Sequence, residues 1–112
     1  MEEESVRQLS GALSSVVTEE GDAATSALTG ELDLDSTPAG EVALTHALSR
    51  YRRTRLDLDE LIFMDSAGIA ALVRLKQQSR ERGVELTVRL GESPVRRVLD
   101  LIRVSEYLGV ED

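Results

Sequence analysis

The alternation of apolar and polar residues predicts strands at several places along this chain. The clearest pattern covers residues 84–90, where every second residue is Val or Leu. Leu56 and Leu58 alternate with charged residues in the same way. Residues 13–18 and 23–29 are weaker candidates because Ala and Ser are poor strand formers, but the segment between them has the composition of a hairpin turn.

Other segments carry apolar residues at the spacing of amphipathic helices. The first helix is expected to begin with Thr37 as N-cap and Pro38 in its first turn, and to fade in the basic cluster at residues 50–53. The second is expected from about residue 66 to residue 82, because Gly83 is a good residue to end it.

A third helix is expected behind Ser93 and Pro94, since the apolar residues that follow fit positions i, i+3, i+4 and i+7. The predicted order is therefore β-β-α-β-α-β-α. Two strand-helix-strand crossovers imply an α/β fold, with a mixed sheet of about four to five strands and helices packed against it. We expect residues 1–12 to be a flexible N-terminal segment and residues 13–112 to be one domain.

The composition fits one small domain and excludes several classes of function. The chain has 112 residues, of which 41% are hydrophobic and 30% charged. A net charge of −8 argues against nucleic acid and against an anionic membrane surface as partners. Because there is no cysteine, a disulfide framework and a thiolate metal site are excluded. No long apolar stretch or signal peptide is recognisable, so the cytoplasm is the expected location.

The segment 62–69 is the best candidate for a functional site. Asp65 and Ser66 stand between an apolar run and the second predicted helix, and both residue types are preferred N-caps. A helix N-terminus presents unpaired amides and a partial positive charge, which would stabilise a phosphate on Ser66. A purely structural cap explains the same two residues, and the spacing alone leaves both readings open.

Carboxylates are expected to gather near this segment, at the ends of the strands. They are Asp33, Asp35, Asp59 and Asp65. Their spacing matches neither a calcium loop nor a set of His and carboxylate ligands, so we predict no metal and no cofactor.

A serine hydrolase is the enzymatic alternative. It would need Ser66 as nucleophile and His46, the only histidine, as base. A nucleophile elbow requires Gly two residues before the serine, and Met64 stands there. We therefore predict that the chain is not an enzyme.

The motifs together resemble a known family. Gly30-Glu31-Leu32-Asp33, then Leu56-Asp57-Leu58, then residues 63–69 resemble the STAS domain, and most closely the bacterial anti-sigma factor antagonists. The resemblance covers about residues 13–110, and its most specific part is the Asp-Ser-x-Gly element at residues 65–68. Ala67 departs from the Ser or Thr of many members, and Ile102-Arg103-Val104 stands where a Gly often breaks the last helix.

The resemblance implies a STAS-like fold and a protein that switches partners. In this family a serine kinase that is also the anti-sigma factor phosphorylates the serine of the motif, and a metal-dependent phosphatase removes the phosphate. The unphosphorylated antagonist binds the kinase and releases the sigma factor. Ser66 would be the phosphorylated residue, and the surface that binds the partner would include Asp33, Asp65, Ser66, Ala67, Gly68 and Ile69.

The residues themselves suggest how such a switch would act. No basic cluster adjoins Ser66 in the sequence, so a phosphate there should repel a partner rather than rearrange the fold. The alternative with the same fold is a scaffold subunit of a lipid transporter or signalling assembly that is never phosphorylated. No long apolar stripe remains for an obligate dimer, so we expect a monomer or a weak dimer.

Overall fold

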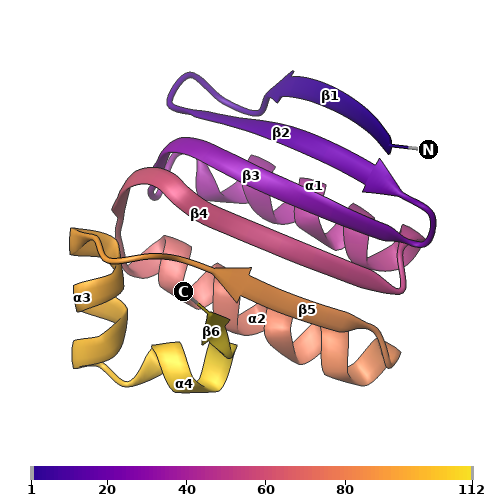
Figure 1. The fold of residues 1–112 in the computed structure, drawn as a ribbon. Helices are drawn as coiled ribbons and strands as arrows, with labels where there is room; N and C mark the ends of the chain where they lie inside the picture. Colours follow the sequence, from indigo (N-terminus) through magenta and orange to yellow (C-terminus); the bar gives the residue numbers. More distant parts are fainter. Residues whose placement is uncertain (1, 112) are drawn as a thin grey trace.

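The computed structural model describes residues 2–111, which form one mixed sheet with two long helices packed against one face (Figure 1). The strands are β1 (Glu2–Gln8), β2 (Leu13–Glu20), β3 (Ala23–Leu32), β4 (Arg53–Met64), β5 (Glu85–Arg89) and β6 (Val110–Glu111). The helices are α1 (Thr37–Arg50), α2 (Ser66–Arg82), α3 (Pro94–Leu101) and α4 (Val104–Leu108). Among these residues, no helix has both the length and the apolar character needed to cross a membrane.

The six strands lie in the order β1-β2-β3-β4-β5-β6, so every strand pairs with its sequence neighbour. The pairs β1–β2 and β2–β3 are antiparallel, whereas β3–β4, β4–β5 and β5–β6 are parallel. The predicted mixed α/β sheet is confirmed, with six strands instead of four to five. Helices α1 and α2 are the crossovers that parallel pairing requires.

The strand β1 differs from the expectation of a flexible segment over residues 1–12. Its backbone pairs with β2 along the whole strand, from Glu2 opposite Glu20 to Gln8 opposite Ser14. The side chains from Glu3 to Gln8 are all exposed, and Val6 is 72% exposed. Such a strand carries no alternating apolar pattern, because only its backbone is used, and the sequence therefore gives no signal for it. Glutamates on an edge strand also discourage pairing with another chain.

The core consists mainly of leucines from both sides of the sheet–helix interface. Its largest fully buried side chains include Leu13, Leu28, Leu48, Leu56, Leu58, Leu72, Leu75, Leu90, Leu99 and Leu108. The single Phe of the chain is 47% exposed, and the buried hydrophobic residues are aliphatic, with Tyr107 partly buried against them. This agrees with the small number of aromatic residues in the sequence.

The helix boundaries agree with the sequence except at the start of α1. Helix α2 spans Ser66–Arg82 and ends at Gly83 in the left-handed conformation, as predicted. The Ser93 hydroxyl caps α3 by accepting a hydrogen bond from the Arg96 amide (3.0 Å). The prediction that Thr37 caps α1 is wrong: Thr37 is already helical, and the N-cap Ser36 makes no side-chain cap hydrogen bond.

Candidate functional site

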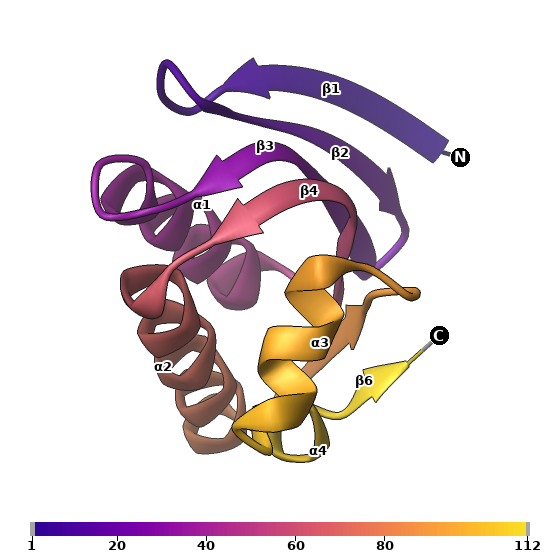
Figure 2. The same cartoon turned by 90° about the vertical axis from the view of Figure 1, so that its left-hand side faces the viewer.

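The ends of the parallel strands β3 and β4 bring two loops together. Leu32 pairs with Met64, so Asp33 and Asp65 follow at the same level of the sheet. The Asp65 amide donates a hydrogen bond to the Leu32 carbonyl oxygen (3.2 Å), which ties the start of α2 to the end of β3. Figure 2 views this edge, where the loop before α1 and the first turn of α2 lie near each other.

Asp65 caps α2 and also holds the neighbouring loop. Its Oδ1 accepts hydrogen bonds from the amides of Ala67 (2.9 Å) and Gly68 (3.2 Å). Its Oδ2 accepts one from the Leu34 amide in the loop before α1 (3.0 Å). Both carboxylate oxygens are therefore used inside the protein, and Asp65 is the side chain that satisfies the first amides of α2.

Ser66 is consequently free of any capping role. It is the first residue of α2 and is exposed, and within residues 2–111 its hydroxyl makes no hydrogen bond. The sequence left open whether Asp65 or Ser66 is the cap, and the structure assigns the cap to Asp65. A hydroxyl at a helix N-terminus that faces solvent is accessible to another protein.

Gly68 allows α2 to begin so close to the sheet. A Cβ atom at this position would lie 2.7 Å from the Leu32 carbonyl oxygen and 2.8 Å from Cγ of Met64. Contacts this short are not tolerated without movement of the backbone, so only Gly fits. The Gly of the Asp-Ser-x-Gly element therefore has a packing role, and it positions Ser66 at the strand edge.

Asp33 organises the loop before α1. Its Oδ1 accepts hydrogen bonds from the amides of Ser36 (2.9 Å) and Asp35 (3.0 Å). These bonds stabilise the ionised form and lower the pKa of Asp33 below its ordinary value of 3.8. The bond from the Ser36 amide has the largest effect. Asp33 is half-buried, and its charge faces the same edge of the sheet as Ser66.

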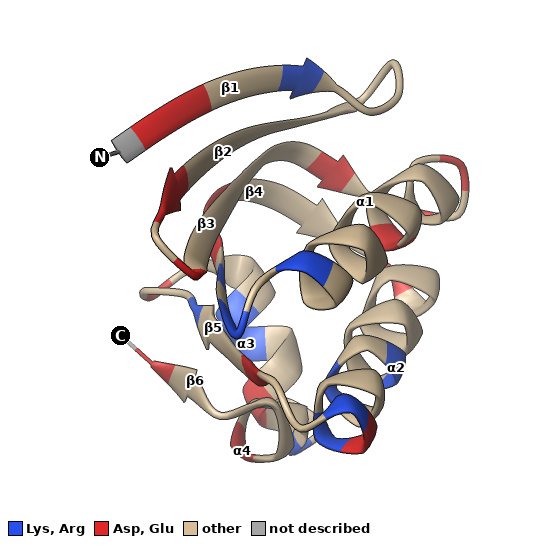
Figure 3. Ribbon diagram, turned by 90° about the vertical axis from the view of Figure 1, so that its right-hand side faces the viewer, with Lys and Arg blue, Asp and Glu red and all other residues tan. Residues whose placement is uncertain are grey.

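The charges on this edge differ in sign from those at the opposite end of the long helices. Acidic residues occupy the loop before α1, and basic residues gather where α1 and α2 end (Figure 3). The last turn of α2 contains Arg80 and Arg82, and the last turn of α1 contains Arg50. Both ends suit the helix dipoles, which favour anions at the N-terminus and cations at the C-terminus.

Exposed apolar side chains surround the Ser66 edge. Leu34 is 74% exposed, Ile62 is 72% exposed and Phe63 is 47% exposed. Leu34 lies beside Asp65 through its backbone hydrogen bond, and Ile62 and Phe63 directly precede the buried Met64 at the end of β4. Ala70, one turn after Ser66, is exposed as well. Large apolar residues left in water around one hydroxyl are typical of a protein-binding surface.

Comparison with known proteins identifies the family. Residues 15–110 match the family model described as "Mlab, STAS domain". The chain belongs to the STAS domain family. No curated protein sequence matches this STAS domain.

Solved structures share its fold at low sequence identity. An anti-sigma factor antagonist from Mycobacterium paratuberculosis aligns with a TM-score of 0.79 and 18% identity, covering 88% of this chain and 85% of its own. The unphosphorylated anti-sigma factor antagonist SpoIIAA aligns with a TM-score of 0.71 and 15% identity, covering 88% of both chains. The phosphorylated form of SpoIIAA, from Bacillus, has also been solved and aligns with a TM-score of 0.65, at 16% identity, over 88% of this chain and 91% of its own. The murine anion transporter Slc26a9 aligns with a TM-score of 0.68 and 18% identity, over 82% of this chain and 16% of its own.

The structure gathers only some of the predicted site residues of this STAS domain on the surface. Ser66 is exposed and Ala67 is half-buried, whereas Gly68 is buried and Ile69 packs against the core. Asp33 and Asp35 share one turn beside Asp65, as expected.

The fourth expected carboxylate, Asp59, lies apart from the other three, so this part of the prediction is wrong. Its carboxylate pairs with Arg89 and accepts a hydrogen bond from the Gly91 amide (2.9 Å), on the β5 side of β4. A register irregularity in the β3–β4 pairing accompanies this stretch of β4. Among residues 2–111 there is no group of three His, Cys, Asp or Glu residues that could hold a metal ion.

His46 lies too far along α1 to act on Ser66. Both long helices begin at the same edge of the sheet, and His46 is nine residues into α1 after Thr37. At the rise of an α-helix this places it about 13 Å from that edge along the helix axis. His46 is exposed there, on a surface that does not include Ser66.

The exposed apolar residues were missed by the sequence analysis. The sequence analysis placed Ile62 and Phe63 in the apolar run before Asp65 and did not single out Leu34. The available signal was the position of these residues: Leu34 stands between two loop aspartates, and Ile62 and Phe63 stand in the last turn of sequence before the Asp65 cap.

Proposed function

We propose that this STAS domain is an anti-sigma factor antagonist of the cytoplasm that is switched by phosphorylation of Ser66. The observation that carries the proposal is the exposed Ser66 hydroxyl, which is left without a structural role because Asp65 caps the helix. The likeness to anti-sigma factor antagonists, one of them solved in phosphorylated form, supports the same assignment. The chain supplies no catalysis in this mechanism. A serine kinase that is also the anti-sigma factor adds the phosphate, and a metal-dependent phosphatase removes it.

The unphosphorylated surface suits a partner with an apolar contact region. Leu34, Ile62 and Phe63 would be covered by the kinase, and burying such side chains contributes about 1.5–3 kcal/mol each when burial is complete. Asp33 and Asp65 would support the partner surface indirectly. Their carboxylates accept hydrogen bonds from the backbone that presents these apolar side chains. When the kinase, which is also the anti-sigma factor, binds this surface, it releases the sigma factor.

Phosphorylation would oppose this contact without changing the fold. The residues placed beside Ser66 are Asp33, Leu34, Asp65 and Ala70, none of which is basic. The ion pair between Arg74 and Glu41 lies about two turns further along α2. A phosphate carrying about −1.5 to −2 charges therefore finds no guanidinium among these residues, and we expect it to stay on the surface. Desolvating it against an apolar partner, or against a like charge, costs about 3 kcal/mol or more, which weakens binding roughly a hundredfold.

The decisive experiment incubates the chain with ATP and the serine kinase that binds it in this proposal. We expect mass spectrometry to find phosphate on the Ser66 peptide of the wild type and none on Ser66→Ala. Calorimetry should give Ser66→Ala the affinity of the unphosphorylated wild type, and Ser66→Glu an affinity lower by at least about tenfold. Gln77→Glu is the matched control, because it adds the same charge at an exposed position further along α2. Equal affinities for wild type and Ser66→Glu would contradict the proposal.

The fold itself should respond little to the modification. We expect the circular dichroism spectrum to be unchanged and the melting temperature to shift by no more than about 2 °C, in keeping with a change of about 0.5 kcal/mol for a surface substitution. Thermal scans of the phosphorylated and unphosphorylated protein measure this directly. A shift of many degrees would mean that the phosphate rearranges the loops around Asp65.

A fixed docking role is the second candidate. It is favoured by the likeness to a region that makes up 16% of the murine anion transporter Slc26a9, and by the family model's description. In that case the chain is an unphosphorylated scaffold subunit of a lipid transporter or a signalling assembly, and the same apolar residues form a permanent contact. The kinase would then leave Ser66 unmodified, while Phe63→Asp would still release the chain from its assembly.

A further inference from the structure

A small pocket lies between the second half of α1 and the strands that this helix covers, β2, β3 and β4 (Figure 1). Its volume is about 40 Å³. Short side chains leave this space between helix and sheet: Ala43 and Ala47 on α1, and Ala24 on β3. Because side chains normally fill the interior of a protein closely, the lining of this pocket shows what could occupy it.

Three buried hydroxyls line the pocket. Ser15 is 2% exposed, Ser26 is 5% exposed and Thr54 is 2% exposed. None of these hydroxyls makes a hydrogen bond to another residue within residues 2–111. Buried polar groups are nearly always hydrogen-bonded, because a desolvated and unpaired group lowers stability. Three such hydroxyls around one space indicate a site for a molecule that bonds to them.

The strand register explains why the hydroxyls meet. Ser26 lies opposite Val17, which is two residues from Ser15 on β2. Ala24, two residues from Ser26 on β3, lies opposite Thr54 on β4. Residues two apart on a strand share one face of the sheet, so the three hydroxyls form a diagonal row on the face that α1 covers.

Charged side chains lie only at the mouth of the pocket. Arg7, His46 and Arg50 belong to its lining and are exposed, and the Tyr51 hydroxyl donates a hydrogen bond to the carboxylate of Glu19. The interior therefore offers hydroxyls and aliphatic walls, without a charge.

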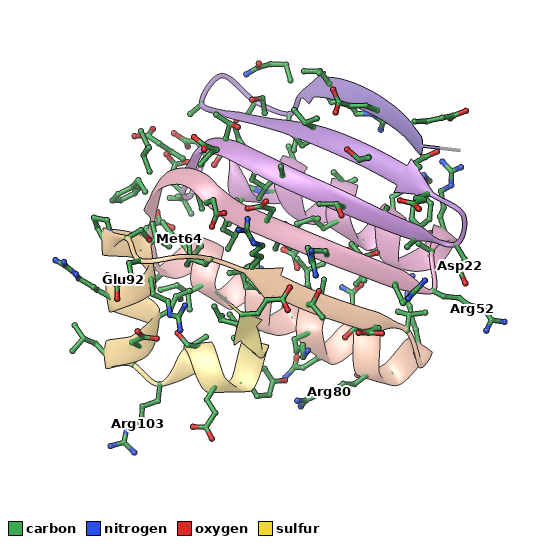
Figure 4. The ribbon with its side chains drawn as sticks, viewed as in Figure 1. Asp22, Arg52, Met64, Arg80, Glu92 and Arg103 are labelled. Atoms are coloured by element: carbon green, nitrogen blue, oxygen red, sulfur yellow. The ribbon has the colours of Figure 1, made fainter. Side chains whose placement is uncertain are left out.

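The turns at the end of the pocket keep their side chains outside it. The Arg52 amide donates a hydrogen bond to the carbonyl oxygen of Asp22 (2.9 Å), which ties the end of α1 to the turn between β2 and β3. The Arg52 side chain extends from this end into solvent (Figure 4). The pocket is thus bounded by a fixed backbone, and no long side chain from these turns fills it.

We propose that this pocket binds a short-chain alcohol of two or three carbon atoms. An alcohol hydroxyl both donates and accepts hydrogen bonds, so it can bond to Ser26 and Thr54 while the carbon chain lies against Ala43 and Ala47. The size agrees, because a buried water needs about 10–15 Å³ of such volume and the pocket has about 40 Å³. Roughly three water-sized groups therefore fit, as in a small alcohol.

Other occupants match the lining less well. A buried water typically makes about three hydrogen bonds, so three waters would need more polar partners than three hydroxyls among aliphatic walls supply. A charged molecule would lose its hydration inside, since the cations of the lining stay at the exposed mouth. The pocket lies along the second half of α1, whereas Ser66 lies near the start of this helix, so the inference does not rest on the proposed function.

An NMR titration of the ¹⁵N-labelled full chain with 1-propanol tests the site. We expect saturable shifts at the amides of Ser15, Ser26 and Thr54, with a Kd in the millimolar range because so few ligand atoms are buried. Glycerol has three carbons with a hydroxyl on each, and it should give no saturable shift because its extra hydroxyls would lie against alanines. Shifts that rise linearly with 1-propanol, as for a pocket that holds only water, or equal binding of glycerol, would overturn the proposal.

Substitution of one hydroxyl provides the second arm of the test. Thr54→Val keeps the shape of the side chain and should weaken 1-propanol binding about tenfold, without loss of stability, since this hydroxyl has no partner in the protein. Thr37→Val is the matched control. Thr37 is 4% exposed and its hydroxyl also lacks a partner among residues 2–111, but it lies outside the pocket.

The control should bind 1-propanol as the wild type does, and circular dichroism checks that both variants are folded. Equal affinities for the wild type and Thr54→Val would contradict the site, as would a loss in Thr37→Val as large as that in Thr54→Val. The comparison of 1-propanol with glycerol needs only the wild type, so it decides the question even if Thr54→Val does not fold.

Discussion

Two Asp-Ser pairs precede the two long helices, and their serines end in opposite environments. Asp35 and Ser36 lie before α1, and Asp65 and Ser66 lie at the start of α2. Ser36 is 1% exposed, and the following Thr37 is 4% exposed, whereas Ser66 is exposed. The same dipeptide therefore gives a structural hydroxyl in one loop and an accessible hydroxyl in the other.

The difference comes from the length of the two connections. Four residues separate β3 from α1, and this loop folds back so that the Ser36 hydroxyl donates to the Glu31 carbonyl oxygen (2.7 Å) and accepts from the Asp33 amide (2.9 Å). Asp65 alone separates β4 from α2, so the next side chain already belongs to the helix and projects outward. Accessibility to a kinase is thus a property of the connection and not of the dipeptide. Ser36 and Thr37 are buried, so neither hydroxyl is accessible to a kinase in the folded protein.

The largest effect is expected at the glycines of the first turns. Gly68→Ala places a Cβ 2.7 Å from a backbone oxygen of Leu32, which cannot move alone, and should lower the free energy of unfolding by about 3 kcal/mol. Gly40→Ala in α1 meets Cδ2 of Leu13 at 3.0 Å, a flexible side-chain end. There the gain in helix propensity of about 1 kcal/mol should offset the contact.

Urea unfolding of both variants measures this contrast. If Gly40→Ala lowers the free energy of unfolding as much as Gly68→Ala does, the close approach of α2 to the sheet is not the reason for the loss. A folded Gly68→Ala variant with unchanged stability would show that α2 shifts outward easily, and with it Ser66.

A smaller effect is expected at the two serines. Ser36→Ala removes a buried hydroxyl and leaves the Glu31 carbonyl and the Asp33 amide without it, so it should cost about 2 kcal/mol of stability. Ser66→Ala should change stability by no more than about 0.5 kcal/mol, because it breaks no hydrogen bond. Denaturant midpoints compare the two, with Ser49→Ala, an exposed helical serine, as a further reference. Similar costs for Ser36→Ala and Ser66→Ala would contradict the contrast in burial.

The smallest effect concerns the pH dependence of the loop before α1. The pKa of Asp33 is lowered in the folded state, chiefly by the hydrogen bond from the Ser36 amide. Its contribution to stability is therefore complete above its ordinary pKa of 3.8 and is lost as the pH falls through the lower folded value. Asp33→Asn should flatten the loss of stability between about pH 5 and pH 3. Urea midpoints across this range check it, and a loss as steep in Asp33→Asn as in the wild type would rule out Asp33 as a contributor.

Local signals in the sequence were sufficient for most of the fold. Helix α2 was predicted with its true boundaries because the cap, the helical spacing and Gly83 act on neighbouring residues. The mixed sheet followed from two crossovers. The start of α1 was misplaced by one residue, because Ser36 uses its hydroxyl for a turn that depends on the chain reversal at Asp33. Strand β1 was missed since its stability comes from backbone pairing with β2 and not from a buried face.

The candidate site also has features that the sequence determines and features that depend on the tertiary structure. The amino-acid sequence by itself determined that Ser66 begins a helix, that Asp65 is available to cap it and that the family is the STAS domain. Only the tertiary structure decided which of the two side chains is the cap, which of the hydroxyls faces solvent, and that Leu34 joins Ile62 and Phe63 at one edge. Capping and periodicity act within one turn of chain, whereas exposure depends on segments about thirty residues apart that meet only when β3 and β4 pair.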